Sequence, residues 1–276
     1  MTKQSLQSPK PLPFTLTDGT KVLLRPVRPE DRARLENGVA ALSYESRYFR
    51  FFTSVARLSD QRLRLLSEVD QQNHVAWIAL DASDPKHPGL GVGRFIRSSE
   101  DPKVAEAAFA VIDAYQRRGL GTILLAVLYV MAEARGVQVL RAIILSENTI
   151  VSNWWRNLGA ADSWVSGEYR LDLSVCYNAA LLPRTRSGEN LGHAIEAVQA
   201  LVRGQEANVS RERRNNMQLV LTDEEKTEVL ELVREEFEEI QTELHHTKNP
   251  GYRDTLKRRH VVLEGLLKRL QTDTGG

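Results

Sequence analysis

The chain has 276 residues, of which 42% are hydrophobic and 26% are charged, and its formal net charge is +1. This composition is typical of a globular protein with one or two domains. The balanced charge excludes a general attraction to nucleic acid or to an anionic membrane, and no apolar run reaches the ~18 residues of a membrane span. The one cysteine, Cys176, cannot form an internal disulfide, which favours a reducing cytoplasm.

The elements before residue 70 are predicted from turn residues and from the spacing of apolar residues. Residues 1–19 contain alternating prolines and lack the apolar core of a secretory signal, so we expect a flexible lead. The remaining elements predicted here are a strand at 21–28 and helices at 29–42, 43–52 and 59–69.

Apolar runs separated by short turns predict an antiparallel meander of strands at 74–80, 89–97 and 104–115. The segment 123–135 is apolar at helical spacing and leads to another strand at 139–145. Because a strand–helix–strand crossover is right-handed and joins parallel strands, 104–115 and 139–145 should be parallel neighbours. After these strands, the sequence predicts a helix at 148–158 and then either a strand pair or one long strand at 163–175.

The loop between the third strand and the long helix reads Gln116-Arg117-Arg118-Gly119-Leu120-Gly121-Thr122. A glycine-containing turn at a helix start directs unpaired backbone N–H groups toward an anion. The glycines let the backbone approach a phosphate closely, and Arg117 and Arg118 add positive charge. The loop therefore predicts a phosphate-binding site, and the alternative is an ordinary turn with two solvated arginines.

The spacing around this loop narrows the choice of phosphate ligand. No Lys-Ser/Thr pair follows the last glycine, as a P-loop requires, and Leu124 stands where a dinucleotide fingerprint has its third glycine. Gln116, Gly119 and Gly121 instead resemble the acyl-CoA-binding motif of the GNAT acetyltransferases, Gln/Arg-x-x-Gly-x-Gly/Ala. This resemblance implies that residues 116–122 hold the pyrophosphate of acetyl-CoA.

Further segments are similar to the acetyltransferase domain of bacterial protein-lysine acetyltransferases that modify acyl-CoA synthetases. They are Arg25-Pro26-Val27-Arg28-Pro29-Glu30-Asp31, Leu42-Ser43-x-Glu45-Ser46-x-Tyr48-x-Arg50-Phe51-Phe52 and Ala105-Glu106-x-Ala108-Phe109. The resemblance implies a GNAT domain over residues 20–177, an α+β fold with α/β/α layers and a mixed, mostly antiparallel sheet. It also implies an acyltransferase that uses acetyl-CoA, with a protein lysine as the favoured acceptor.

Glu106 is the candidate catalytic base. A lysine amine has a pKa near 10.4, so a base must remove its proton, directly or through water, before it can attack a thioester. Glu106 is a lone carboxylate in an otherwise apolar strand, where burial would raise its pKa, and the resembling lysine acetyltransferases carry their catalytic glutamate at this position. The alternative is a solvent-facing glutamate, while Glu100 and Asp101 lie in a turn and are weaker candidates.

The resemblance also implies the remaining contacts of acetyl-CoA. The backbone of Phe109, Ala110, Val111 and Ile112 would meet the pantetheine chain and the oxyanion, at a bulge where this strand splays from the next. Asn148 and Trp155 belong to a second family signature, in which a tyrosine that protonates the departing thiolate usually stands at the position of Trp155. An indole is no acid at physiological pH, so the sequence names no general acid.

Two further interpretations concern Trp155 and metal ions. Trp155 and its neighbour Trp154 are either core residues, which we favour, or a wall beside the CoA arm. The histidines show no zinc-ligand spacing with a cysteine, so no metal is expected.

The composition changes after residue 177. Residues 178–216 are predicted to be a linker with room for one helix at about 191–203. Residues 217–272 should form an antiparallel helical hairpin, because Thr222 and Glu225 form a capping box, a Pro-Gly pair breaks the chain, and the first helix is acidic while the second is basic. Two helices bury little surface alone, so the hairpin should pack on the acetyltransferase, on another copy or on a partner and serve assembly or regulation.

The first hypothesis is therefore a cytoplasmic N-acetyltransferase in which a protein lysine attacks acetyl-CoA directly, with Glu106 as base. Acetylation of a small amine or of a peptide N-terminus is the alternative within the enzymes. A non-catalytic acyl-CoA sensor that acts through the hairpin is the alternative from another class. The missing tyrosine favours the sensor and the retained Glu106 disfavours it.

Overall fold

The central strand β3 (His74–Asp81) is buried along almost its whole length. Successive side chains of a strand point to opposite faces of the sheet. Val75, Trp77 and Ala79 belong to one core cluster, and Ala76, Ile78 and Leu80 belong to another. Helices therefore cover both faces of the sheet, and the predicted α/β/α layers are confirmed.

The computed structural model describes residues 10–52, 57–175, 178, 182–215, 222–246 and 250–272. The chain divides into two units, residues 1–211 and 212–276, each of which is described by itself. Across the described residues, no helix combines the length and the apolar character that a membrane crossing requires.

The first unit is built on one sheet of eight strands in the order β1-β2-β3-β4-β5-β6-β8-β7. Besides β3, its strands are β1 (Leu12–Thr15), β2 (Lys21–Pro26), β4 (Gly89–Arg97), β5 (Val104–Val111), β6 (Val139–Ile144), β7 (Ala161–Val165) and β8 (Glu168–Ser174). Only β5 and β6 pair in parallel, and the other neighbours are antiparallel. The predicted meander, the parallel crossover and the mostly antiparallel sheet are confirmed.

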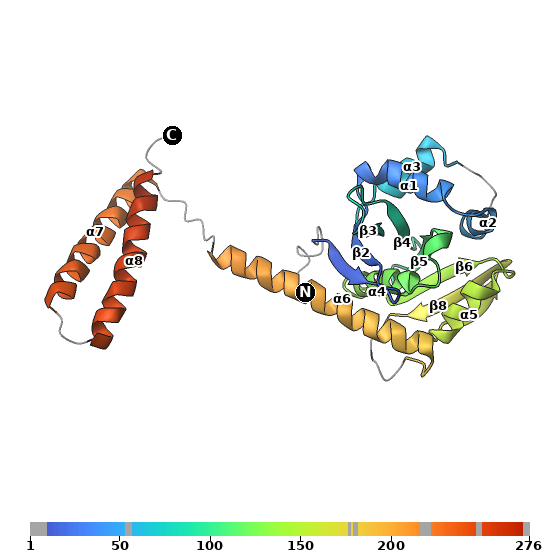
Figure 1. The fold of residues 1–276 in the computed structure, drawn as a ribbon. Coiled ribbons are helices and arrows are strands. Elements are labelled where there is room, and N and C mark those ends of the chain that lie inside the picture. Colours follow the sequence, from blue (N-terminus) through green and yellow to red (C-terminus); the bar gives the residue numbers. More distant parts are fainter. Residues whose placement is uncertain are drawn as a thin grey trace. The chain divides into compact units, whose positions relative to one another are not determined.

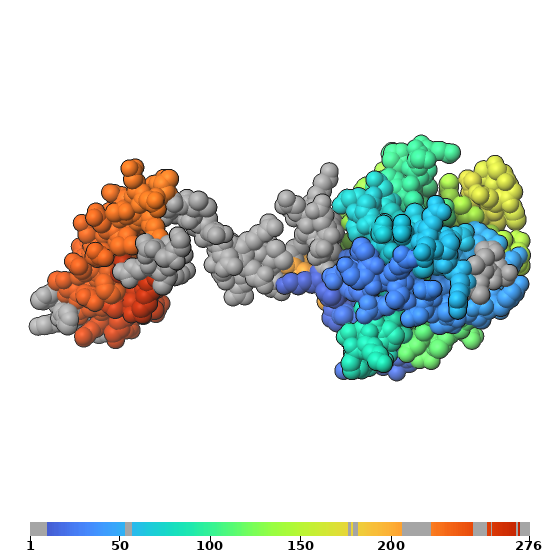
Figure 2. Space-filling model, turned by 90° about the horizontal axis from the view of Figure 1, so that it is seen from above, coloured from blue at the N-terminus to red at the C-terminus, as the bar shows by residue number. Residues whose placement is uncertain are grey.

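The helices divide between the two faces of this sheet (Figure 1). One layer contains the short η1 (Pro29–Asp31), α1 (Arg32–Ala40), α2 (Tyr44–Phe51) and α3 (Asp60–Ser67). The other contains α4 (Leu120–Glu133), α5 (Thr149–Asn157) and the first half of α6 (Arg186–Asn215), whose buried side chains share one core cluster. In Figure 2 the first layer, coloured blue to cyan, covers much of the visible face of the first unit.

The helix predicted at about 191–203 is present, but it is longer than predicted, so the linker expected over the rest of 178–216 is mostly wrong. The helix α6 is continuous over residues 186–215 and begins where Thr185 Oγ1 accepts a hydrogen bond from Gly188 N at 3.0 Å. Its residues Leu191, Ile195, Val198 and Val202 are buried in the main core. Packing of this apolar side outweighs the polar composition and the ~1 kcal/mol that Gly204 costs within a helix.

The structure also differs from the boundaries predicted for the N-terminal lead and for the strand at 104–115. Residues 12–15 of the expected flexible lead form β1, which pairs with β2 and buries Leu12 completely, while residues 1–9 lie outside the described part of the chain. The strand expected at 104–115 ends at Val111, and Asp113–Tyr115 forms the short 3-10 helix η2. Cys176 also lies outside the described residues.

The second unit contains the predicted antiparallel hairpin of α7 (Asp223–His246) and α8 (Pro250–Thr272), drawn in orange and red in Figure 1. The capping box is present, since Thr222 N donates to the Glu225 carboxylate at 2.9 Å and Glu225 N donates to Thr222 Oγ1 at 3.3 Å. Between the helices, Arg259 pairs with Glu236 at 2.5 Å. The proposed role of the hairpin in assembly or regulation stays a prediction.

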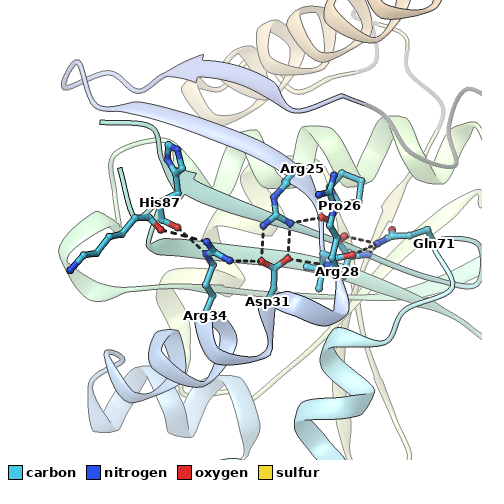
Figure 3. A network of polar contacts seen from close by, with 10 residues as sticks. Arg25, Pro26, Arg28, Asp31, Arg34, Gln71 and His87 are labelled. Atoms are coloured by element: carbon cyan, nitrogen blue, oxygen red, sulfur yellow. Dashed lines mark hydrogen bonds and ion pairs between the residues drawn. The ribbon is translucent and has the colours of Figure 1, made fainter. Parts of the chain in front are cut away.

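A buried ion pair attaches the first helical layer to the sheet (Figure 3). Arg25, at the end of β2, donates hydrogen bonds of 2.6 Å to each carboxylate oxygen of Asp31, which is completely buried in η1. Arg28 N donates to the same carboxylate at 3.0 Å, and Arg34 adds a contact of 3.2 Å. Burial alone would raise the pKa of Asp31, but these donors and the positive charges hold it below its usual value.

Gln71 continues this network toward α3 and β3. Its side-chain amide donates to Val27 O and Ala76 O at 3.1 Å each, and its side-chain oxygen accepts from Ala76 N at 3.3 Å. Arg34 also donates to His87 O at 3.1 Å, which ties α1 to the turn between β3 and β4. The first helical layer is therefore held to the sheet by directed polar contacts as well as by apolar packing.

Replacing Asp31 by asparagine should lower the free energy of unfolding of the first unit by about 3–5 kcal/mol, because Arg25 would remain buried without a counter-ion. Urea unfolding followed by tryptophan fluorescence measures this loss. The tryptophans Trp77, Trp154, Trp155 and Trp164 all lie in residues 1–211, so the signal reports on the first unit.

The matched control is Asp60→Asn. Asp60 pairs with Arg32 on the surface, and its side chain is 83% exposed, so its loss should cost at most about 1 kcal/mol. Equal losses in the two variants would contradict the structural role of the buried pair.

Candidate active site

Strands β5 and β6 pair over only part of their length. The parallel ladder joins residues 104–106 of β5 to residues 139–141 of β6. Beyond Glu106, β5 stays paired with β4 up to Val111, whereas β6 stays paired with β8 up to Ile144. The two strands therefore diverge, and the second half of β5 has one backbone edge that faces an opening in the sheet. The predicted splay is present.

The backbone direction along β5 shows which groups face this opening. Ile112 donates its N–H to Leu90 O at 3.0 Å, so its backbone points toward β4. Successive N–H groups of a strand point to opposite edges, so those of Phe109 and Val111 point toward the opening and that of Ala110 points toward β4. Within the predicted set 109–112, Phe109 and Val111 are thus the residues that can offer N–H groups there.

The bulge expected within 109–112 is wrong, because the β4–β5 register runs without a shift. Glycines on β4 make room for β5 instead. A Cβ added at Gly93 would stand 3.1 Å from the ring of Phe109, and one added at Gly91 would stand 3.0 Å from Ala110 O. The strands can therefore lie close together with Phe109 packed across them, and no extra residue is needed.

The loop 116–122 forms a concave row of backbone donors. Arg117 and Gly119 have left-handed φ angles of 58° and 89°, and α4 starts at Leu120 without a side-chain cap. Within the described part of the chain, no protein acceptor binds the N–H groups of residues 117–122. Consecutive free N–H groups at the positive end of a helix dipole form a site for an anion such as a phosphate.

The side chains of the loop mostly brace it. Gln116 donates to Val111 O at 3.0 Å and to Ser46 Oγ at 3.2 Å. Arg118 pairs with Asp18 at 2.7 Å and lies over the ring of Tyr115.

The other loop residues differ in what they can offer an anion. Arg117 is exposed, and the described residues provide no partner for its guanidinium. Leu120 is 1% exposed and so can contribute only its N–H, and Gly121 and Thr122 are half-buried.

Asp113 ties this loop to α2, a role that the sequence did not reveal. Its carboxylate accepts hydrogen bonds of 2.8 Å from Ser43 N, Ser43 Oγ and Ser46 Oγ. Partial burial raises the pKa of Asp113, but these donors more than offset that effect and lower it. The sequence signal for this contact is the spacing of Ser43 and Ser46, which places both hydroxyl groups at the start of the helix predicted at 43–52.

Asn148 and Trp155 take structural positions. Asn148 is 8% exposed and caps α5, because its side-chain oxygen accepts from Val151 N at 3.3 Å. Trp155 is 1% exposed and packs with Phe109 and Trp154, at ring distances of 6.4 Å and 6.2 Å. The core interpretation of Trp155 therefore holds, and its side chain is not placed as a surface contact for CoA.

Glu106 is exposed, so the expected burial of its carboxylate is wrong. The residue directly opposite it on β4 is Ile96, which is itself 45% exposed, because the first helical layer does not cover this end of the strands. In the described residues Glu106 has no ion-pair partner. Burial lowers the pKa of the nearby Arg50 guanidinium, and the negative charge of Glu106 partly offsets this effect. The carboxylate is accessible and unpaired, as a base that receives a proton must be.

These features agree with comparisons to known proteins. A model of the acetyltransferase (GNAT) domain matches residues 21–161. The chain belongs to the GNAT family. It is 35% identical over 173 residues to Acetyltransferase Pat of Mycolicibacterium smegmatis, over 63% of this chain and 49% of that protein. It is 31% identical over 134 residues to Acetyltransferase PA5475 of Pseudomonas aeruginosa, over 49% of this chain and 72% of that protein.

A solved structure adds to this comparison. The GNAT domain of S. lividans PAT matches with a TM-score of 0.55 and 25% identity, over 63% of this chain and 99% of that domain. The chain spans about half the length of Pat from Mycolicibacterium smegmatis. The matched family is one of acetyltransferases, and it implies acetyl-CoA as the donor. The free N–H groups of residues 117–122 fit the pyrophosphate of that donor.

Replacing Gly119 by alanine should weaken CoA binding at least about tenfold, because a side chain at φ +89° is strained and displaces the row of N–H donors. Isothermal titration calorimetry with CoA measures the change.

Gly136→Ala is the matched control for this variant. Gly136 has a φ of +73° and, like Gly119, open space around its added Cβ, but it lies beyond the other end of α4. It should lose similar stability and keep its CoA affinity. Unchanged affinity in the Gly119 variant would contradict the assignment of the loop to the donor.

Proposed function

We propose that the protein transfers an acetyl group from acetyl-CoA to the side chain of a lysine in a protein substrate, with Glu106 as general base. The observation that supports this proposal most strongly is the place of Glu106. It is the last residue of β5 that pairs with β6, so its carboxylate stands where the sheet begins to open. The free N–H groups of residues 117–122 follow the far end of the same strand.

This arrangement assigns separate tasks to the two ends of β5. The loop and the positive end of α4 hold the pyrophosphate of acetyl-CoA, and Arg117 supplies an uncommitted positive charge. The pantetheine arm then follows the open edge of β5 toward Glu106. Phe109 N–H and Val111 N–H point to that edge, and we assign them to the pantetheine amides and to the oxyanion of the tetrahedral intermediate.

The acceptor amine arrives on the side of Glu106. Glu106 accepts the proton of the ammonium group, directly or through one water molecule, and the neutral amine attacks the thioester carbon. The bond to sulfur then breaks, the sulfur leaves as a thiolate, and the nitrogen releases its second proton to solvent as the amide forms. No residue is assigned as general acid, because Trp155, at the position of the family tyrosine, is buried and holds no acidic proton.

The exposure around Glu106 supports a macromolecular acceptor. Glu106 and the neighbouring Ile96 lie uncovered at the surface, so the long side chain of a lysine can reach the carboxylate while its own protein stays outside. A small amine needs a more enclosed site to be held in a productive orientation.

Glu106→Gln should keep acetyl-CoA affinity within about twofold and lower kcat by about 10²-fold or more, because the amide cannot accept the proton. The assay is release of free CoA thiol with acetyl-CoA and a panel of lysine peptides, together with calorimetry of CoA binding. Glu100→Gln is the matched control, since Glu100 is an exposed acid in the turn before β5 and should leave kcat unchanged.

Unchanged turnover in the Glu106 variant would refute the base assignment. Faster turnover of free polyamines or amino acids than of any peptide would favour the small-amine alternative. Tight CoA binding without turnover of any amine by the natural protein would favour the acyl-CoA sensor.

A further inference from the structure

A partly open cavity lies between the first helical layer and the strands β4 and β5. Its volume is about 40 Å³, and its walls are mainly apolar, with Leu35, Val92, Ala110 and Ile112 among them. The charged residues on its walls are Arg34, Arg50 and Arg94, and none of the described residues that line it is an acid. Three guanidinium groups without a carboxylate are unusual neighbours of an apolar cavity.

Arg94 is the most deeply buried of these side chains. It is 3% exposed and lies on β4 directly opposite Ala108 of β5. Glu106 is two residues from Ala108 on β5, so the side chains of Arg94 and Glu106 lie on the same face of the sheet. Its terminal nitrogens each donate to Leu66 O at 3.2 Å, but its Nε is buried and has no acceptor. A buried charged donor without a partner is costly, which points to an acceptor that completes the site.

Arg50 reaches the same cavity from α2. Its side chain is half-buried, and the described residues give its guanidinium no hydrogen bond and no ion pair. Burial and the positive charge of Arg50 lower the pKa of Arg94 to about 9. Arg34, by contrast, has an ion-pair partner in Asp31, which it shares with Arg25. Arg50 and Arg94 are thus two positive charges that share a cavity and lack a counter-ion there.

Neighbouring groups do not neutralise these charges. His74 Nε2 lies 3.1 Å from Arg94, and burial and the charge of Arg94 lower the pKa of His74 to about 4, so His74 is neutral at physiological pH. Glu106 is near enough to affect Arg50 but forms no ion pair with it, and Arg62 on α3 adds further positive charge. The cavity therefore has a net positive potential.

We propose that this cavity is a carboxylate-binding subsite in which Arg50 and the Nε of Arg94 bind a carboxylate of the substrate. The proposal rests on the proposed function, since Ala110 and Ile112, beside the path assigned to the pantetheine arm, line the cavity. A guanidinium pair matches the two oxygens of a carboxylate in charge and in geometry. The carboxylate has two chemical sources: the end of a dicarboxylic acyl group on the donor, or an acidic side chain next to the acceptor lysine.

The first arm of the test varies the acceptor and the second varies the donor. The acceptor arm compares kcat/KM for two peptides that differ only in Glu or Gln beside the lysine, with acetyl-CoA as donor. The donor arm compares succinyl-CoA with butyryl-CoA on one peptide. We expect a preference of about tenfold for the carboxylate in one arm, and its loss in Arg50→Gln. The arm that shows the preference identifies the source.

Arg62→Gln is the matched control. It removes a nearby positive charge outside this cavity, so it should keep the preference. Arg50 is half-buried, so its replacement is better tolerated than that of Arg94, and thermal unfolding checks that each variant is folded. No preference in either arm, or a preference that survives in Arg50→Gln, overturns the proposal.

A binding measurement separates this proposal from the proposed function. Glutarate should raise the Tm of the natural protein more than neutral glutaramide does at equal ionic strength, and the difference should vanish in Arg50→Gln. If no peptide is acetylated, the proposed function fails while glutarate binding still decides on the subsite. If peptides are acetylated, but glutarate and glutaramide raise the Tm equally and neither arm shows a preference, the carboxylate subsite is refuted while the proposed function stands.

Discussion

The early end of the β5–β6 ladder is the constraint on which the site depends. A strand in the middle of a sheet normally satisfies its backbone groups on both edges, and β5 does so only as far as Glu106. Beyond that residue β5 follows β4 and β6 follows β8, so one edge of β5 keeps free N–H groups. Unpaired backbone polarity inside a sheet is costly unless a ligand completes it, and an extended amide-containing chain such as pantetheine has the matching groups.

The opening would be of little use if the elements around it could move independently. The first helical layer is fixed by the buried pair of Arg25 and Asp31, and its helix α2 is joined through Asp113 to the segment that leads into the loop 116–122. Opposite it, Arg118 links the same loop to Asp18 in the turn between β1 and β2. The loop is thus braced from two sides by ion pairs and hydrogen bonds that its own backbone does not use. Its N–H groups stay free because the side chains carry the structural contacts.

The sequence predicted the parts of this molecule that depend on local patterns. Apolar alternation, turn residues and the glycines of the loop 116–122 located nearly all strands and helices, the parallel crossover and the turn that starts α4. The failures came where distant packing decides. Glu106 looked buried because its strand is apolar, but its exposure depends on how far the α1–α3 layer extends over the sheet. The half of α6 called a linker is helical, although its composition suggested otherwise. Likewise, Arg50 and Arg94 are far apart in sequence, and only the fold brings them to one cavity.

The position of Trp155 clarifies which catalytic group the reaction can do without. In the tetrahedral intermediate of the proposed reaction, the thiolate and the amine compete to leave, and the group with the lower pKa leaves more readily. A thiol has a pKa near 8.5 and a lysine ammonium near 10.4, so the thiolate leaves more readily even while the nitrogen still carries its extra proton, and once that proton is lost the amine can no longer compete. A general acid would speed this step without changing its direction. Replacing the family tyrosine by a buried tryptophan therefore has little effect on which group leaves, whereas in the proposed mechanism the loss of Glu106 slows the deprotonation that must precede attack.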